Sequence, residues 1–129
     1  MADYYTQFSF MLETTKEQRE FLVKYFEDRV EEDEEDDDAY AALDCLTAED
    51  DGLWIHNDER LPGALLEGIQ TLLAQFPNLK PVAFEAAETC SKPRLDSFGG
   101  LAVRITAQEI RVKSTSELVN EWAADDETK

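Results

Sequence analysis

Apolar and polar side chains alternate at the start of the chain and then change to helical spacing. Residues 4–12 place Phe8, Phe10 and Leu12 on one side of an extended segment, which predicts a strand with one apolar face. A capping-box sequence at residues 14–17 follows, and apolar residues at helical spacing continue to about Val30. The chain is therefore predicted to begin with a strand and a helix.

The same analysis predicts the elements of the remaining chain. Short strands are expected at residues 42–47 and 53–56, joined by a turn that ends in Asp51-Gly52. A helix should begin at Pro62, with Asp58 as its cap, and end before Pro77. A strand at residues 82–89, a hairpin over residues 101–113 and a last helix complete the predicted order.

The order of elements over residues 4–89 is strand, helix, strand, strand, helix, strand. This order predicts an α+β fold of the ferredoxin-like βαββαβ type, with an antiparallel sheet in strand order 4-1-3-2 and both helices on one face. The hairpin and helix of residues 101–124 would extend or cover that sheet. With 129 residues and 43% hydrophobic content, residues 1–129 are expected to form one domain.

The net charge of -18 is concentrated in one part of the chain. Residues 31–60 carry fourteen acidic side chains and one basic side chain. Such a field opposes binding to nucleic-acid phosphates or anionic lipid and attracts basic protein surfaces. We therefore expect no direct nucleic-acid partner and no membrane partner, whereas a basic protein surface is favoured. A homodimer stays open, because residues 104–113 also predict a small basic stripe.

An unbroken acidic run at residues 31–38 dominates this charge. Carboxylates at the end of the preceding helix oppose its dipole and repel one another, which predicts a mobile, solvated loop. A calcium loop is not predicted, because the EF-hand pattern requires Gly where Asp38 stands. The predicted partner-binding residues are Glu31, Glu32, Asp33, Glu34, Glu35, Asp36, Asp37, Asp38, Asp50 and Asp51.

Other reactive side chains form no complete catalytic set. His56 is the single histidine, and its strand position predicts a half-buried structural side chain. Cys45 and Cys90 are expected to be free thiols in a reducing compartment. No catalytic residue, metal site or cofactor is predicted, and the chain is not expected to be an enzyme.

The loop of residues 91–100 has two interpretations. Lys92 and Arg94, with the small residues around them, could form a backbone nest that binds an anion. The paired glycines that follow are also what a turn before a hairpin requires.

Three segments resemble a group of small bacterial proteins that are often carried on mobile elements. These segments are the start YYTQFSF, the DGLWI hairpin and the stretch from CSKPR to FGG. The resemblance implies a bacterial or phage setting, and it implies no catalytic residues.

The leading functional hypothesis is an acidic interaction protein. It would mimic nucleic acid and block a basic nucleic-acid-binding protein of bacterial defence or regulation. The alternative is a small ferredoxin-like binding or regulatory module in which the acidic run is only a solvated loop. A cytoplasmic location is expected, because the start of the chain lacks a signal peptide and no apolar run could span a membrane.

Overall fold

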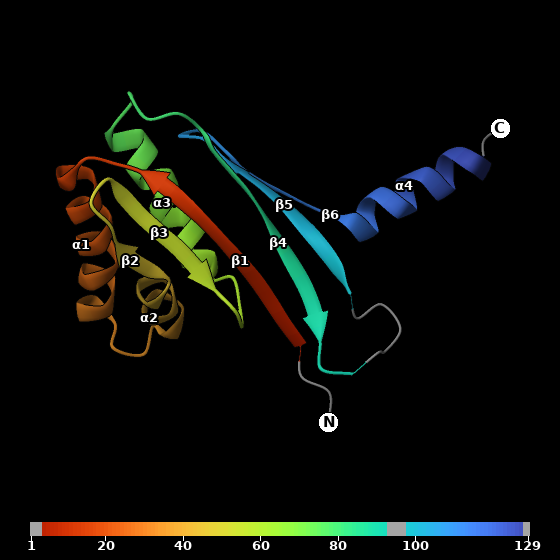
Figure 1. The fold of residues 1–129 in the computed structure, drawn as a ribbon, viewed down its shortest axis with the longest axis horizontal. Helices are drawn as coiled ribbons and strands as arrows, with labels where there is room; N and C mark the ends of the chain where they lie inside the picture. The colour runs from red at the N-terminus through yellow and green to blue at the C-terminus, as the bar shows by residue number, and fades with distance from the viewer. Residues whose placement is uncertain (1–3, 93–97, 128–129) are drawn as a thin grey trace.

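A six-stranded antiparallel sheet and four helices make up the described part of the chain, residues 4–92 and 98–127 of the computed structural model (Figure 1). The predicted α+β class and antiparallel sheet are therefore confirmed. In chain order the elements are β1 (Tyr4–Glu13), α1 (Lys16–Glu32), α2 (Asp37–Asp44), β2 (Leu46–Ala48), β3 (Gly52–Asn57), α3 (Gly63–Gln75), β4 (Val82–Cys90), β5 (Gly99–Ile105), β6 (Ile110–Ser114) and α4 (Thr115–Glu127).

The strands lie in the order β2-β3-β1-β4-β5-β6. The C-terminal hairpin therefore extends the sheet beyond β4, so β4 is an interior strand and not the edge strand that a four-stranded sheet would have. Cys45, just after α2, and Cys90, at the end of β4, are both free. Within the described residues, no helix is long and apolar enough to cross a membrane.

The core lies between the sheet and three helices. Phe8 on β1 pairs in register with Ala86 on β4, and Leu12 pairs with Leu53 on β3, so the apolar sides of these strands face the same way. Helices α1, α2 and α3 cover this side of the sheet (Figure 1). Leu22 and Phe26 of α1 are fully buried there. The alternation seen in the sequence therefore corresponds to one face packed on helices.

The prediction of one continuous loop over residues 31–38 is wrong, and its mobility stays a prediction. Helix α1 continues to Glu32, and a new helix, α2, begins at Asp37, so only residues 33–36 connect them. The strand predicted from residue 42 is correspondingly shorter, because residues 42–44 belong to α2. The physical reason is that carboxylates unsuited to the C-terminus of one helix suit the N-terminus of the next, where the dipole is favourable.

The other face of the sheet has no helix packed over it in the described residues (Figure 1). We call it the open face. It carries Trp54 and His56 on β3, and Arg104 and Arg111 on β5 and β6. Helix α4 follows β6 without a linker and projects away from the rest of the molecule (Figure 1).

Candidate functional site

Two carboxylates of the acidic run cap helices. Asp36 is the N-cap of α2, and its side chain accepts a hydrogen bond from the backbone N–H of Ala39 at 3.0 Å. Asp38 reaches the start of α3, where it accepts from the backbone N–H of Ala64 at 2.6 Å and pairs with Arg60 at 2.6 Å. The cap predicted for α3, Asp58, is therefore wrong, because the carboxylate at this terminus comes from α2.

Arg29 fixes the turn between α1 and α2 from the other side. Its guanidinium pairs with Asp36 at 3.2 Å and with Glu67 of α3 at 3.0 Å. The Arg29 and Asp36 side chains retain only 29% and 19% of their exposure, so water screens this pair less than it screens a surface pair. Together with the Asp38 contacts, these ion pairs tie the acidic run to α1, α2 and α3.

The remaining carboxylates of the run point to solvent. Asp33 uses its side chain to accept from the backbone N–H of Glu35 at 3.0 Å, a local turn contact. The five others are exposed, and no hydrogen bond or ion pair within the described residues engages their side chains. We call these five the free carboxylates: Glu31, Glu32, Glu34, Glu35 and Asp37.

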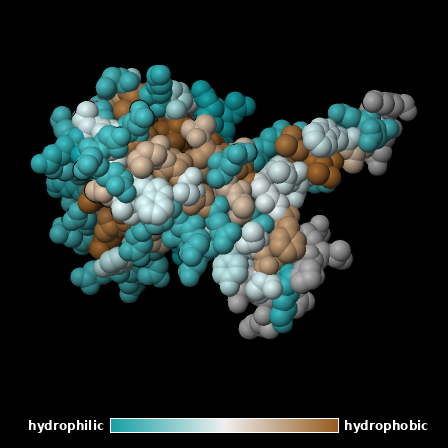
Figure 2. Space-filling view, in the orientation of Figure 1, coloured by the Kyte–Doolittle hydropathy of each residue, from teal (hydrophilic) through white to brown (hydrophobic). Residues whose placement is uncertain are grey.

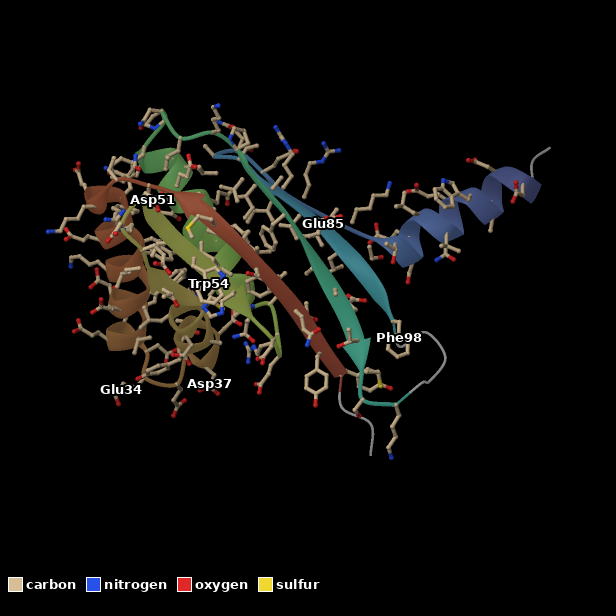
Figure 3. All side chains as sticks on the ribbon, in the orientation of Figure 1. Glu34, Asp37, Asp51, Trp54, Glu85 and Phe98 are labelled. Carbon is tan, nitrogen blue, oxygen red and sulfur yellow. The ribbon has the colours of Figure 1, made fainter. Side chains whose placement is uncertain are left out.

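The predicted site residues Asp50 and Asp51 do not join the free carboxylates. Figure 3 shows Asp51 at one end of the helical layer and Glu34 and Asp37 at the other. The backbone N–H of Thr14 donates to the Asp51 carbonyl at 3.1 Å, which places this turn beside the start of α1. Helix α1 has 17 residues and is therefore about 25 Å long. The structure thus splits the predicted partner-binding set into two groups.

The predicted anion loop is described only in part. Lys92 is exposed beyond the end of β4, and Arg94 lies outside the described residues. Neither interpretation of this loop is therefore tested. Within the described residues, no group of His, Cys, Asp or Glu side chains is arranged to hold a metal ion.

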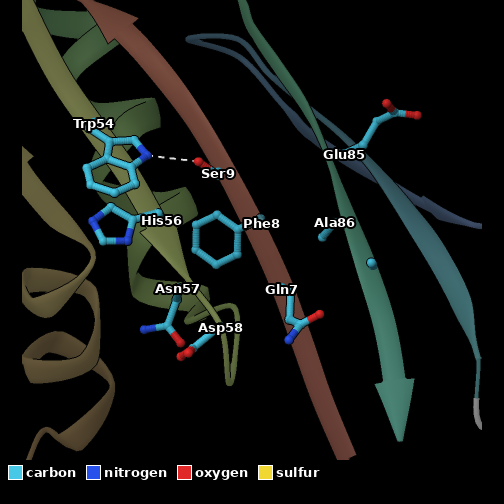
Figure 4. Close-up of a pocket in the computed structure, with 10 residues that line it drawn as sticks. Gln7, Phe8, Ser9, Trp54, His56, Asn57, Asp58, Glu85 and Ala86 are labelled. Carbon is cyan, nitrogen blue, oxygen red and sulfur yellow. Dashed lines mark hydrogen bonds between the residues drawn. The ribbon is translucent and has the colours of Figure 1, made fainter.

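A shallow hollow on the open face brings aromatic and polar side chains together (Figure 4). The rings of Trp54 and His56 stack with centroids 3.6 Å apart and an interplanar angle of 20°. Trp54 Nε1 donates to Ser9 Oγ at 2.8 Å, and His56 Nε2 lies 3.1 Å from Thr47 Oγ1. His56 is half-buried, as predicted. This flat pair could stack against one planar group.

Cys45 is buried at the C-terminal end of α2. Its burial depends on how the part of the molecule that carries residues 31–38, which we call the acidic end, is packed. The Cys45 side chain is fully buried, and its Sγ donates to the Ala41 carbonyl at 3.2 Å and lies 3.7 Å from Asn57 Nδ2. Desolvation by burial raises the pKa of the Cys45 thiol from 9.0 to about 11, because the thiolate would lose its hydration.

The sequence contained a signal for α2. Residues 36–43 combine an N-cap Asp, two further Asp residues in the first turn and three alanines, all of which favour a helix. The charge of the run obscured it. The contacts that Arg29 and Asp38 make with α3 could not be predicted from local sequence, because their partners Glu67 and Ala64 are distant in the sequence.

Comparisons with protein-family models, with curated proteins and with solved structures found no match to this chain. The resemblance to small bacterial mobile-element proteins stays a prediction.

Proposed function

We propose that this protein is an acidic interaction protein that occupies the basic groove of a nucleic-acid-binding protein and so excludes nucleic acid from it. The observation that carries the proposal is the combination of charge and fixed geometry at residues 31–38. Five free carboxylates lie on the end of α1, the turn after it and the start of α2, a region that Arg29 and Asp38 tie to three helices. Duplex DNA presents about one charge per 1.7 Å of axis, and a competitor needs a comparable density on a fixed surface.

The fixed turn matters energetically. A mobile acidic loop would lose conformational entropy on binding, of about 1–2 kcal/mol per ordered residue. A turn already ordered by its own ion pairs avoids most of that cost. We take the partner to be a cytoplasmic bacterial protein of defence or regulation, in line with the resemblance.

We also propose that residues 4–90 are a ferredoxin-like unit to which other elements have been added. The order β2-β3-β1-β4, with α1 and α3 on one face, supports this assignment. Helix α2 and the hairpin of β5 and β6 are departures from that fold.

A second candidate function rests on the open face. The Trp54 and His56 stack, with Ser9 and Asn57 at its border, favours a small binding module for a planar ligand. In that case the free carboxylates serve only solubility.

Affinity capture from a bacterial lysate separates the two functions. The bait is the full chain, used at about 0.1 M and about 1 M salt, between which the Debye length falls from about 10 to about 3 Å. A captured protein supports mimicry if it binds duplex DNA, loses that DNA when the chain is added, and is released at high salt. Capture that is unaffected by salt, or a captured protein that keeps its DNA, contradicts mimicry.

Two matched variants make this test specific. The first replaces the five free carboxylates by the corresponding amides and should lose the captured protein. The control neutralises an equal number of exposed carboxylates elsewhere and should retain it: Glu13, Glu17, Glu20, Glu85 and Glu109. Equal losses in both would show that net charge alone drives binding. A Trp54→Ala variant should retain the captured protein under mimicry, and loss of that protein would place the binding surface on the open face instead.

A further inference from the structure

Helix α4 exposes apolar side chains that its own chain does not cover. Val119 and Trp122 are 58% and 61% exposed, and Leu118 lies on the same side of the helix. Apolar atoms are visible along the projecting helix in Figure 2. Helices of about 12–15 residues are marginal in water without tertiary packing, and α4 has 13. These observations indicate that α4 requires a packing partner to be stable.

Helix α4 is also acidic throughout. Its described side chains include carboxylates at Glu117, Glu121, Asp125 and Asp126, and its sequence has no Lys or Arg. Two α4 helices packed on each other would bring their carboxylates together, which is unfavourable. The partner surface should therefore be basic and partly apolar.

Such a surface exists on the open face of β4, β5 and β6. Arg104 on β5 pairs directly across the strands with Arg111 on β6, although like charges in that position destabilise a sheet. Ala83 of β4, which has a small side chain, pairs in register with Arg104 of β5. Ala102 of β5 pairs in register with Lys113 of β6. These residues line one hollow, which we call the basic hollow.

Glu85 and Glu117 also line the basic hollow, and carboxylates of the same chain pair with two of its three cations. Arg111 pairs with Glu109 at 3.4 Å, and Lys113 pairs with Glu121 at 2.9 Å. No carboxylate of the described residues forms an ion pair with Arg104. An acidic helix laid over this hollow would relieve the repulsion between the two arginines.

The chain's own α4 is badly placed to fill the basic hollow. It begins at Thr115, directly after β6 ends at Ser114, and it points away from the sheet (Figure 1). Only its first turns reach the border, where Glu117 lines the hollow and Glu121 pairs with Lys113. Trp122 and Val119 extend beyond it.

We propose that α4 of one copy docks in the basic hollow of a second copy, and that the exchange is reciprocal. Trp122 and Val119 then pack on the alanine side chains of the open face, and the acidic side chains face Arg104 and Arg111. A two-fold arrangement of this kind makes the same contact twice. Trp122 beside an arginine also gains a cation–π contact.

The size of α4 sets the approximate area of the interface. A helix of 13 residues is about 20 Å long and about 10 Å wide, so two docked helices bury on the order of 800 Å² in total. That is below the roughly 1,200–2,000 Å² of standard specific interfaces, so a weak, reversible dimer is expected. The assembly should therefore be measured from about 1 to several hundred µM.

Sedimentation equilibrium of the full chain over this range tests the proposal. The natural chain should dimerise, and Trp122→Ala and the double variant R104E/R111E should each raise the dissociation constant at least tenfold. The control K16E/K24E makes the same charge change at exposed positions of α1 and should leave the dimer intact. Circular dichroism should show that every variant is folded.

Mixing variants tests the exchange itself. Trp122→Ala has a defective helix and an intact hollow, whereas R104E/R111E has an intact helix and a defective hollow. An equimolar mixture should form a heterodimer more tightly than either variant forms a homodimer, because one docking contact is intact and the two defects fall together on the other contact, which either defect alone already disrupts. A mixture that associates no better than its components overturns the exchange.

Tryptophan emission identifies what covers α4. The chain has two tryptophans, so Trp54→Phe leaves Trp122 as the only reporter. Its emission should shift to shorter wavelength as the dimer forms. Exposed emission at every concentration, or buried emission in a monomer whose helix has folded back on its own chain, overturns the proposal. A dimer that persists in both variants of the interface also overturns it.

Discussion

The turn between α1 and α2 and the C-terminal helix α4 are both strongly acidic, but their carboxylates differ in the contacts they make. At the turn, Arg29 and Arg60 come from other segments to hold Asp36 and Asp38. In α4, Glu121 in the middle of the helix pairs with Lys113 of β6, and Val119 and Trp122 beside it stay exposed. The same kind of charge is thus part of a fixed surface in one region and borders an exposed apolar stripe in the other.

This difference shows how acidic segments can be interpreted. Carboxylates that cap helices and pair with arginines hold the segment that carries them in place, and their neighbours form an exposed acidic surface. Carboxylates beside exposed Val119 and Trp122 mark a segment whose packing partner lies elsewhere. Net charge alone does not distinguish these two kinds of acidic segment.

The largest expected effect contrasts an aromatic side chain from each region. Phe26 is fully buried in α1, where a Cβ at Gly68 of α3 would collide with its ring. Phe26→Ala should lower the free energy of unfolding by about 3–5 kcal/mol, because it leaves a cavity. Trp122→Ala, measured by urea denaturation at a concentration where the chain is monomeric, should change it by less than about 0.5 kcal/mol. Similar losses would mean that α4 is packed in the monomer.

A smaller effect is expected from the carboxylate that links α2 to α3. Asp38→Ala removes both the ion pair with Arg60 and the acceptor for the Ala64 N–H, at a helix start whose N-cap, Pro62, has no side-chain cap. The free energy of unfolding should fall by about 1–2 kcal/mol. Asp37→Ala is the matched control, one residue away and exposed, and it should have little effect. If the two variants were equally stable, the acidic turn would not be tied as described.

The thiol of Cys45 tests the rigidity of the acidic end. In a Cys90→Ser background, a water-soluble disulfide reagent should modify Cys45 only when the region around α2 opens, and Asp36→Ala or Asp38→Ala should speed that reaction. Rapid labelling of the parent protein would indicate a mobile acidic end.

The pH dependence of stability provides a second measurement on Cys45. Its folded-state pKa of about 11 lies above the ordinary value of 9.0. The unfolded chain therefore loses this proton first, so the contribution to stability is complete below about pH 9 and is lost as the pH rises towards 11. Cys45→Ala should show a weaker decline than the parent protein over that interval, measured by urea denaturation at each pH.

The smallest effect on stability is expected from the free carboxylates. Converting all five to amides should leave the unfolding midpoint unchanged or slightly higher, because like-charge repulsion falls and no described contact is lost. Extending the change to Asp33, Asp36 and Asp38 should reverse this result, because those side chains hold the turn and the helix ends. Thermal unfolding of the two variants at the same salt concentration makes the comparison.

Local patterns were sufficient for much of the fold. Alternation at Phe8 and Leu12, helical spacing around Phe26 and the Asp51-Gly52 turn predicted strands and helices that the structure contains. The α+β class and the antiparallel sheet follow from the order of those elements. Such features depend on residues a few positions apart, and a single sequence displays that spacing directly.

The state of the acidic run was decided by tertiary structure. By itself, the sequence determined that residues 31–38 are strongly charged, and repulsion then favoured a loop. In the fold, Arg29 and the start of α3 lie beside the run, and Asp38 accepts from Ala64, 26 positions away. Only the packing of the three helices brings these groups within hydrogen-bond distance, and their attraction then outweighs the repulsion between neighbouring carboxylates. The exposure of α4 has the same origin, because the end of β6 sets its direction and the apolar spacing of its sequence does not.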